Sequence, residues 1–152
     1  GAQMYEAVRK RFNQCDILIM TAAIMDYRPK VVADHKIKKF ELEMVIEMEP
    51  VIDVLATVAR NKTSQLVVGF AAETTDLLAY ARDKMQRKGL DMIVANDVSA
   101  PGVGFAHDTN AVTLLRPDAE PVEIDLASKR DVARAVIDTI VSIRSTHRQD
   151  FA

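Results

Sequence analysis

The chain has 152 residues, which is enough for one domain with a substantial hydrophobic core. A formal net charge of −2 argues against a basic nucleic-acid-binding face, and no apolar run approaches the roughly 20 residues of a membrane helix. The single cysteine, Cys15, excludes an internal disulfide and fits a reducing compartment. We therefore expect a cytoplasmic domain without nucleic-acid or membrane partners.

The first part of the chain predicts a helix, a buried strand and a pair of short strands. Apolar residues at helical spacing predict a helix over residues 5–13, and the apolar run at 15–22 predicts a buried parallel strand. The Arg28-Pro29 dipeptide is expected to break the chain. Alternating residues at 35–40 and 41–48 predict an antiparallel flap, whose apolar side must cover this core or a partner subunit.

The rest of the chain alternates helices with strands. Helices are predicted over 50–60, from Thr74 or Thr75 to Lys88, and over 128–145. Strands are predicted at 65–71, 91–95, 110–115 and 121–124, with a loop at 100–110. The pattern predicts one α/β domain over residues 1–152: a Rossmann-like three-layer sandwich with a mostly parallel sheet, a small antiparallel flap and a C-terminal hairpin.

Small residues follow the first buried strand. Met20 is followed by Thr21, Ala22 and Ala23, and Asp26 comes three residues later. In open α/β sheets, ligands bind beyond the carboxyl ends of the strands. A carboxylate at Asp26 could therefore hold a metal-bound phosphate, although a turn acid or a helix cap would look the same in the sequence.

Two groups of lysines are candidates for neutralising phosphate. Lys36 opens the basic cluster 36–39, and Lys84 and Lys88 are four residues apart on one helix face. The alternatives are an edge strand whose lysines discourage aggregation and a solvated helix face near a C-terminus. Phe70 ends the second buried strand before another run of small residues, and its alternative is a core aromatic.

Other familiar signatures are absent from the sequence. It has no G-x-G-x-x-G, Walker A, C-x-x-C or H-E-x-x-H motif, which argues against an NAD-type Rossmann enzyme. His35, His107 and His147 lack metal-ligand spacing, so we expect surface roles for them. Cys15 has no local base and is interpreted as a structural thiol.

Five segments together resemble bacterial phosphopantothenoylcysteine synthetases. They are AAIMDYRP, KIKK, VGFAAET, IVANDV and GFAHDTNAVTLL, and the likeness extends over residues 3–145. The resemblance implies a phosphopantothenate–cysteine ligase in which CTP, with Mg²⁺, activates 4′-phosphopantothenate as an acyl-cytidylate and cysteine displaces CMP. It also implies a homodimer formed through the flap at 36–48. In that family a flavin-dependent decarboxylase forms the N-terminal half, so FMN is expected there and not in this domain.

The resemblance also implies residue roles. Backbone groups of Met20, Thr21 and Ala22 would line the nucleotide, Asp26 would contact CTP or its cation, and Lys36 would contact phosphate and support catalysis. The nucleotide site would further contain Phe70, Lys84 and Lys88, with Ala23, Asp53 and Asn96 as secondary candidates. Lys84 and Lys88 are expected roughly 15–20 Å from their helix start, so either the nucleotide lies along the helix or the helix serves a partner subunit's site.

Two departures from the family pattern limit this interpretation. The family's Asn-Pro-Asp-Ile segment is here Glu49-Pro50-Val51-Ile52, and Asp53 matches the aspartate only after a shift. The family's Gly-rich phosphate loop and its Asn-x-Ser-Ser-Gly segment are not in the sequence. We therefore expect an N-terminally truncated synthetase domain that keeps much of the CTP pocket but has little ligase activity alone. The alternative is a non-catalytic nucleotide-binding or scaffold module of the same fold.

Overall fold

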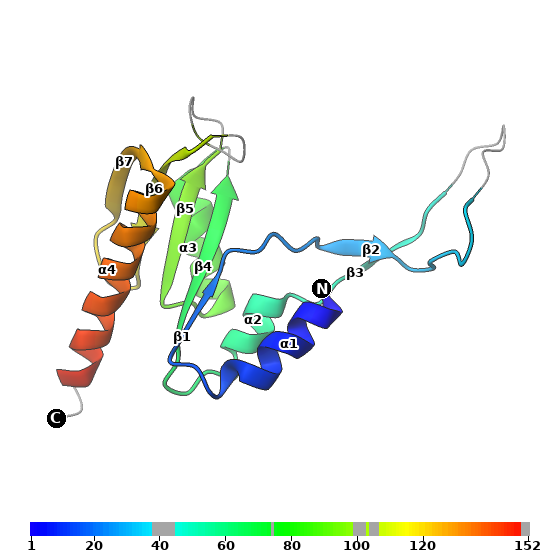
Figure 1. The fold of residues 1–152 in the computed structure, drawn as a ribbon, viewed down its shortest axis with the longest axis horizontal. Coiled ribbons are helices and arrows are strands. Elements are labelled where there is room, and N and C mark those ends of the chain that lie inside the picture. The colour runs from blue at the N-terminus through cyan, green and yellow to red at the C-terminus, as the bar shows by residue number, and fades with distance from the viewer. Residues whose placement is uncertain (38–44, 74, 99–102, 104–106, 150–152) are drawn as a thin grey trace.

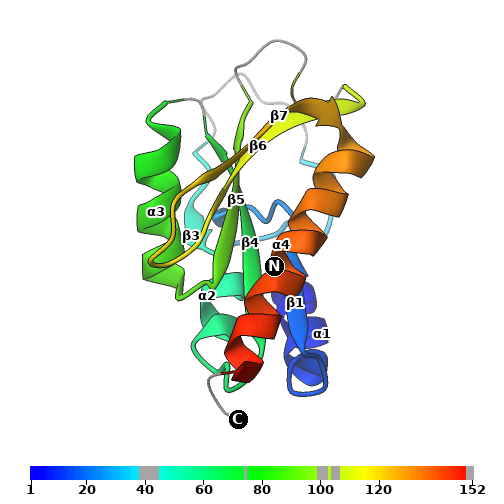
Figure 2. The same ribbon diagram turned by 90° about the vertical axis from the view of Figure 1, so that its left-hand side faces the viewer.

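The computed structural model describes residues 1–37, 45–73, 75–98, 103 and 107–149. Its body is a twisted sheet with helices on both faces, and a thin arm projects from one side of that body (Figures 1 and 2). No helix in the described part of the chain is long and apolar enough to cross a membrane. The predicted Rossmann-like sandwich is confirmed.

The main sheet has the strand order β1-β4-β5-β6-β7. Its strands are β1 (Ile17–Met20), β4 (Leu66–Glu73), β5 (Met92–Asp97), β6 (Thr109–Leu115) and β7 (Val122–Ser128). The first three are parallel, whereas β6 and β7 form the predicted hairpin and run antiparallel to their neighbours. The parallel strands are apolar without alternation because both of their faces are covered.

Helices divide the core into two layers. On one face, α1 (Ala2–Phe12), α2 (Val54–Ala59) and α3 (Leu77–Lys88) cover side chains such as Val67 and Ile93. On the other face, α4 (Lys129–Gln149) covers Val68 and Val94. All four of these strand residues are fully buried, so burial in both layers stabilises the centre of the sheet.

Two glycines shape the first layer. Gly89 ends α3 with a left-handed φ of 66°, and its N–H bonds to the carbonyls of Met85 and Gln86. A Cβ on Gly69 would lie 2.7 Å from Leu90 Cδ1 and 2.9 Å from Leu55 Cδ2. The absence of a side chain at Gly69 therefore lets these two leucines pack directly on the backbone of β4.

The arm is built differently from the predicted flap. Its two strands are β2 (Tyr27–Pro29) and β3 (Met48–Pro50), which pair antiparallel. The ion pairs Arg28–Glu49 at 2.7 Å and Lys30–Glu47 at 3.2 Å join its two sides. The expected chain break at Arg28-Pro29 is therefore wrong, because an isolated two-stranded ribbon tolerates proline on its edge.

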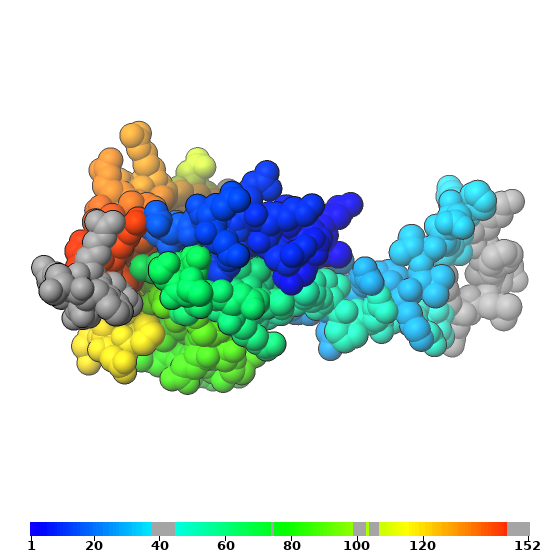
Figure 3. Space-filling model, turned by 90° about the horizontal axis from the view of Figure 1, so that it is seen from below, coloured from blue at the N-terminus to red at the C-terminus, as the bar shows by residue number. Residues whose placement is uncertain are grey.

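The strands predicted at 35–40 and 41–48 are not found where the chain is described. Residues 35–37 and 45–47 lie outside any strand, and residues 38–44 are outside the described part. Figure 3 shows the arm extending well away from the body. Many apolar side chains along it are exposed: Met25, Tyr27, Val31, Val32, Ile37, Val45, Ile46 and Met48.

Helix starts also differ from the prediction. The helix expected from residue 50 begins at Val54, because Pro50 ends β3 and the Asp53 carboxylate caps α2 by accepting from the Ala56 N–H at 3.0 Å. The helix expected to be capped by Thr74 or Thr75 begins at Leu77. Its cap position is Asp76, with a left-handed φ of 44° and no side-chain capping bond. Thr74 lies outside the described residues.

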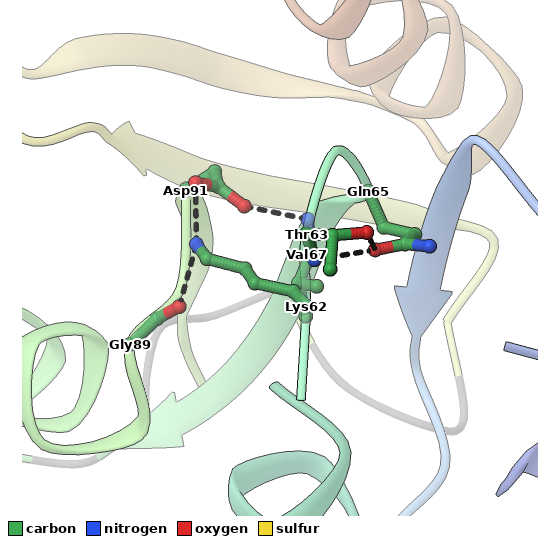
Figure 4. Close-up of polar contacts among 6 residues, drawn as sticks. All are labelled: Lys62, Thr63, Gln65, Val67, Gly89 and Asp91. Carbon is green, nitrogen blue, oxygen red and sulfur yellow. Dashed lines mark hydrogen bonds and ion pairs between the residues drawn. The ribbon is translucent and has the colours of Figure 1, made fainter. Parts of the chain in front are cut away.

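A set of hydrogen bonds centred on Asp91 joins the amino ends of β4 and β5 (Figure 4). The Lys62 ammonium donates to Asp91 Oδ1 at 2.6 Å and to the Gly89 carbonyl at 2.9 Å. The other carboxylate oxygen of Asp91 accepts from the backbone N–H of buried Val67 at 2.8 Å. The Asp91 carboxylate therefore accepts a hydrogen bond from a backbone N–H of buried β4 and also balances the charge of Lys62.

We predict that Asp91→Ala lowers the free energy of unfolding by about 2 kcal/mol, because it leaves a buried backbone donor and a lysine without their acceptor. Urea denaturation of the two proteins measures the difference. The matched control is Asp83→Ala, which removes an exposed pair with Arg87 and should change stability by less than about 0.5 kcal/mol. Equal losses in both variants would contradict the role given to Asp91.

Candidate functional site

The three parallel strands end at one edge of the sheet, but not at the same level. Met20, the last residue of β1, pairs with Gly69, whereas β4 continues for four more residues to Glu73. At about 3.3 Å per residue, β4 extends roughly 13 Å beyond the end of β1. Residues 21–23, which follow Met20, are exposed and mostly small. The predicted approach to the backbone at the end of β1 is therefore open in the structure.

Four charged residues meet beside this edge, on the face covered by α2 and α3. Lys88 Nζ lies 2.8 Å from Asp53 Oδ2, and Lys84 Nζ lies 3.8 Å from Glu73 Oε1. Lys84 also acts electrostatically on Asp53. We call Asp53, Glu73, Lys84 and Lys88 the lysine–carboxylate cluster.

The distance from the helix start is shorter than expected for Lys84, whereas Lys88 lies about 16 Å from Leu77, within the expected range. Because α3 begins at Leu77, Lys84 lies only about 10 Å from the helix start. Helical side chains also lean toward the N-terminus, which points both ammonium groups back toward the edge. The partner of Lys84 agrees with this direction, since Glu73 is the last residue of β4, and Lys88 reaches Asp53, the residue before α2.

Asp53 both caps α2 and forms an ion pair with Lys88. Burial raises the pKa of the Asp53 carboxyl, but hydrogen bonds from Lys88 and from the Ala56 N–H, with the charges of Lys88 and Lys84, hold that pKa below its ordinary value. The carboxylate form is therefore favoured at the start of α2. This geometry gives Asp53, a secondary candidate in the sequence, a defined place beside two other candidates.

Phe70 and Asn96 lie on the opposite face of the same edge. Phe70 is half-buried and packs with the core under α4. Asn96 comes two residues after Val94 on β5, so its side chain is on the same face of the sheet as Val94, which lies in that core. Asn96 Oδ1 is buried and has no hydrogen-bond partner among the described residues. An unsatisfied buried acceptor costs about 1–3 kcal/mol, so a ligand that donates a hydrogen bond there would relieve that cost.

Asp26 and Lys36 are not brought together in this chain. Asp26 lies at the base of the arm, where its carbonyl accepts from the Val51 N–H at 2.7 Å. Lys36 belongs to the exposed segment beyond β2, on the outer part of the arm (Figure 1). In the described part of the chain, neither charged group has a side-chain partner. Their predicted meeting at one phosphate therefore requires a second subunit or movement of the arm.

Carboxylates near the edge are the candidate ligands for a magnesium ion. The described residues contain no group of three or more His, Cys, Asp or Glu side chains arranged to hold a metal. Magnesium is commonly bound by one or two carboxylates together with substrate phosphates. Asp26 fits this partial donor set, because its carboxylate has no side-chain partner among the described residues, whereas the two Asp53 oxygens are already engaged by Lys88 and by the Ala56 N–H.

Sequence reasoning missed Glu73 as part of the site. Its signal was present, since an acid at the carboxyl end of a buried strand occupies the edge where ligands bind. Its partner Lys84 is eleven positions further along the chain and meets it only because α3 folds back beside β4.

Fold and edge together define a Rossmann-like α/β domain with a charged carboxyl edge and a projecting two-stranded arm. The profile of the family described as "DNA/pantothenate metabolism flavoprotein C-terminal domain" matches residues 1–143. The chain belongs to this family.

Known relatives and structures agree with that assignment. The chain is 44% identical over 143 residues to the coenzyme A biosynthesis bifunctional protein CoaBC of Bacillus subtilis. The matched region covers 94% of this chain and 35% of the relative. It therefore spans about a third of that relative's length. The crystal structure of the C-terminal domain of a CoaBC protein superposes with a TM-score of 0.77 at 38% identity, over 96% of this chain and 63% of the other.

A more distant structure shares the fold. It is a Cab2 mutant in complex with phosphopantothenate-cysteine, with a TM-score of 0.65 and 16% identity, covering 88% of this chain and 46% of that one.

We predict that Lys88→Met reduces the loss of stability on acidification. Because the pKa of Asp53 is depressed in the fold, its contribution is present above the unfolded pKa of about 3.9 and is lost as pH falls through the folded value. Asp53 is 47% exposed, so solvent screening keeps this contribution below about 1 kcal/mol. Thermal midpoints at pH 7 and pH 3 measure the change.

The matched control for this pH experiment is Arg87→Met, one residue earlier on the same helix. Arg87 pairs with exposed Asp83, so its loss should leave the difference between the two midpoints unchanged. If Lys88→Met also left that difference unchanged, Lys88 would not be what lowers the Asp53 pKa.

Proposed function

We propose that this chain is the ligase domain that joins cysteine to 4′-phosphopantothenate in coenzyme A biosynthesis, using CTP. The observation that carries the proposal is the 44% identity to a coenzyme A biosynthesis bifunctional protein across 94% of the chain. The charged carboxyl edge supports it, because a triphosphate needs cationic partners at a ligand site of this fold. The ligand named for the Cab2 complex is the product of the proposed reaction.

The proposed reaction has two steps. A carboxylate oxygen of 4′-phosphopantothenate attacks the α-phosphorus of CTP, and pyrophosphate leaves to give an acyl-cytidylate. The amine of cysteine then attacks the acyl carbon, loses a proton and displaces CMP, which forms the amide. Activation is needed because a free carboxylate resists attack by an amine, whereas a mixed anhydride carries a good leaving group.

In this proposal, residues on both faces of the sheet edge contact the nucleotide. Lys84 and Lys88 would contact the phosphates, and the backbone at Met20–Ala22 with Ala23 would line the nucleotide at the end of β1. Phe70 would pack against the base, and Asn96 Oδ1 would accept from its amino group. Asp26 would hold Mg²⁺, which would supply charge neutralisation for the triphosphate.

Lys36 is assigned to the site of a second copy of the chain. It lies on an arm that projects from the body and exposes a row of apolar side chains, a combination typical of a surface that pairs with another subunit (Figure 3). A homodimer through the arm would bury these side chains and deliver the Lys36 ammonium to phosphate. This arrangement also accounts for the separation of Lys36 from the lysine–carboxylate cluster within one chain.

The alternative is a module that binds a nucleotide without catalysis. A cytoplasmic ligase domain and such a module differ in one measurable property, which is pyrophosphate release. We propose that the chain, extended by its expected upstream segment, releases pyrophosphate from CTP only when 4′-phosphopantothenate is present. CTP binding without pyrophosphate release in the extended chain would favour the module.

We predict that Asn96→Ala weakens CTP binding by about tenfold or more, because it removes the acceptor for the base amino group. The same change should leave thermal stability without ligand unchanged or slightly higher, since an unsatisfied buried acceptor disappears. Calorimetric titration measures the affinity for CTP and, for comparison, for UTP, whose base lacks the amino group, and the thermal midpoint without ligand measures the stability.

Asn13→Ala, which removes an exposed amide at the end of α1, is the control for the Asn96 experiment. It should leave both affinities unaltered. Equal CTP affinity of the Asn96→Ala variant and the unaltered chain would remove Asn96 from the nucleotide site.

We predict that in the extended chain Lys36→Gln lowers the rate of pyrophosphate release by about a hundredfold or more, because charge stabilisation of the reacting phosphates is lost. Its thermal midpoint should stay constant, since Lys36 is exposed and has no side-chain partner among the described residues. A stability loss as large as the rate loss would return Lys36 to a structural role in the arm.

Mixing experiments test where Lys36 acts. If each site combines the body of one subunit with Lys36 of the other, mixed dimers of Lys36→Gln and Asn96→Ala chains contain one intact site. At a CTP concentration too low to fill the weakened Asn96→Ala sites, random mixing should then restore about a quarter of the activity. No recovery after verified subunit exchange would place Lys36 in the site of its own chain.

A further inference from the structure

The two lysines of the cluster are held in different ways. Lys88 is 19% exposed and donates to Asp53 at 2.8 Å, and the same carboxylate caps α2 through the Ala56 N–H. Lys84 is 28% exposed and lies 3.8 Å from Glu73, which is beyond hydrogen-bonding distance. Lys88 is therefore fixed to a second structural element, whereas Lys84 is attracted to Glu73 without being locked to it.

Glu73 stands at the point where β4 ends. In the pairing of β4 with β5 it lies beside Asp97, so two acidic residues end adjacent strands at the carboxyl edge. Lys84, reaching back from α3, balances part of this negative charge. A triphosphate brought to the same edge carries the same sign of charge as Glu73 and competes with it for the Lys84 ammonium.

We propose that Glu73 is a positioning residue that holds Lys84 while the site is free of nucleotide and yields it to a phosphate when nucleotide binds. The inference rests on the proposed function, because it needs a nucleotide at this edge. Exchange of one anion for another costs little when the first ion pair is long and partly solvated. Glu73 thereby weakens nucleotide binding and speeds nucleotide release, while Lys88 stays with Asp53.

The first test is Glu73→Gln, which keeps the size of the side chain and removes its charge. CTP should bind about five to ten times more tightly, and its dissociation should slow, because the competing anion is gone. The gain should be smaller for CMP, which carries fewer phosphates. A structural role would give the opposite result, with lower thermal stability and unchanged or weaker CTP binding.

The second test shows whether Glu73 acts through Lys84. In a Lys84→Met background, Glu73→Gln should change CTP affinity by less than about twofold, since there is no ammonium left to compete for. An undiminished gain in that background would mean that Glu73 repels the nucleotide directly, and it would overturn the positioning role. Glu73→Asp, which keeps the charge but shortens the side chain, should give an intermediate affinity and serves if Glu73→Gln does not fold.

The outcomes separate this inference from the proposed function. If the unaltered chain does not bind CTP, the nucleotide site itself is wrong. If it binds CTP and Glu73→Gln binds no more tightly, the nucleotide site stands and the role of Glu73 is wrong.

Discussion

The parallel pairing of β1, β4 and β5 is the constraint on which the rest of the molecule depends. Parallel strands bring their carboxyl ends to one edge, and connecting helices must then lie on the faces of the sheet. Val67 and Val68 are both fully buried because helices cover both faces of β4. This packing fixes the register, and the register decides which polar residues emerge at the edge.

Charge at that edge is arranged in pairs of unequal strength. The Lys88–Asp53 pair also caps α2, so it ties α3 to the helix beside it and serves the fold. The longer Lys84–Glu73 pair joins α3 to the tip of β4 and caps nothing. If the edge binds the proposed nucleotide, this difference would be useful, because a fixed cation gives orientation and an exchangeable one gives reversibility.

Much of the fold could be predicted because buried parallel strands are unbroken apolar runs, and Gly89 marks the end of α3 in the sequence. A small antiparallel flap was also predicted, but not the positions of its strands, because β2 and β3 are about twenty residues apart and their pairing depends on partners that local alternation does not reveal. The individual candidates near the edge were named from the resemblance and stay predictions. Their contacts were not, since Glu73 meets Lys84 through side-chain direction and helix placement.

The unequal lengths of the strands would allow the proposed nucleotide to contact both faces of the sheet. Phe70 and Asn96 lie on the α4 face, whereas Lys84 and Lys88 lie on the face of α2 and α3. A continuous sheet edge would separate these groups. Because β1 ends level with Gly69 while β4 continues to Glu73, a step is left beside β4, and only the small residues 21–23 follow β1 there. A nucleotide crossing that step would reach the unsatisfied amide on one side and the ammonium groups on the other, and a bulky residue at Ala22 or Ala23 would close the passage.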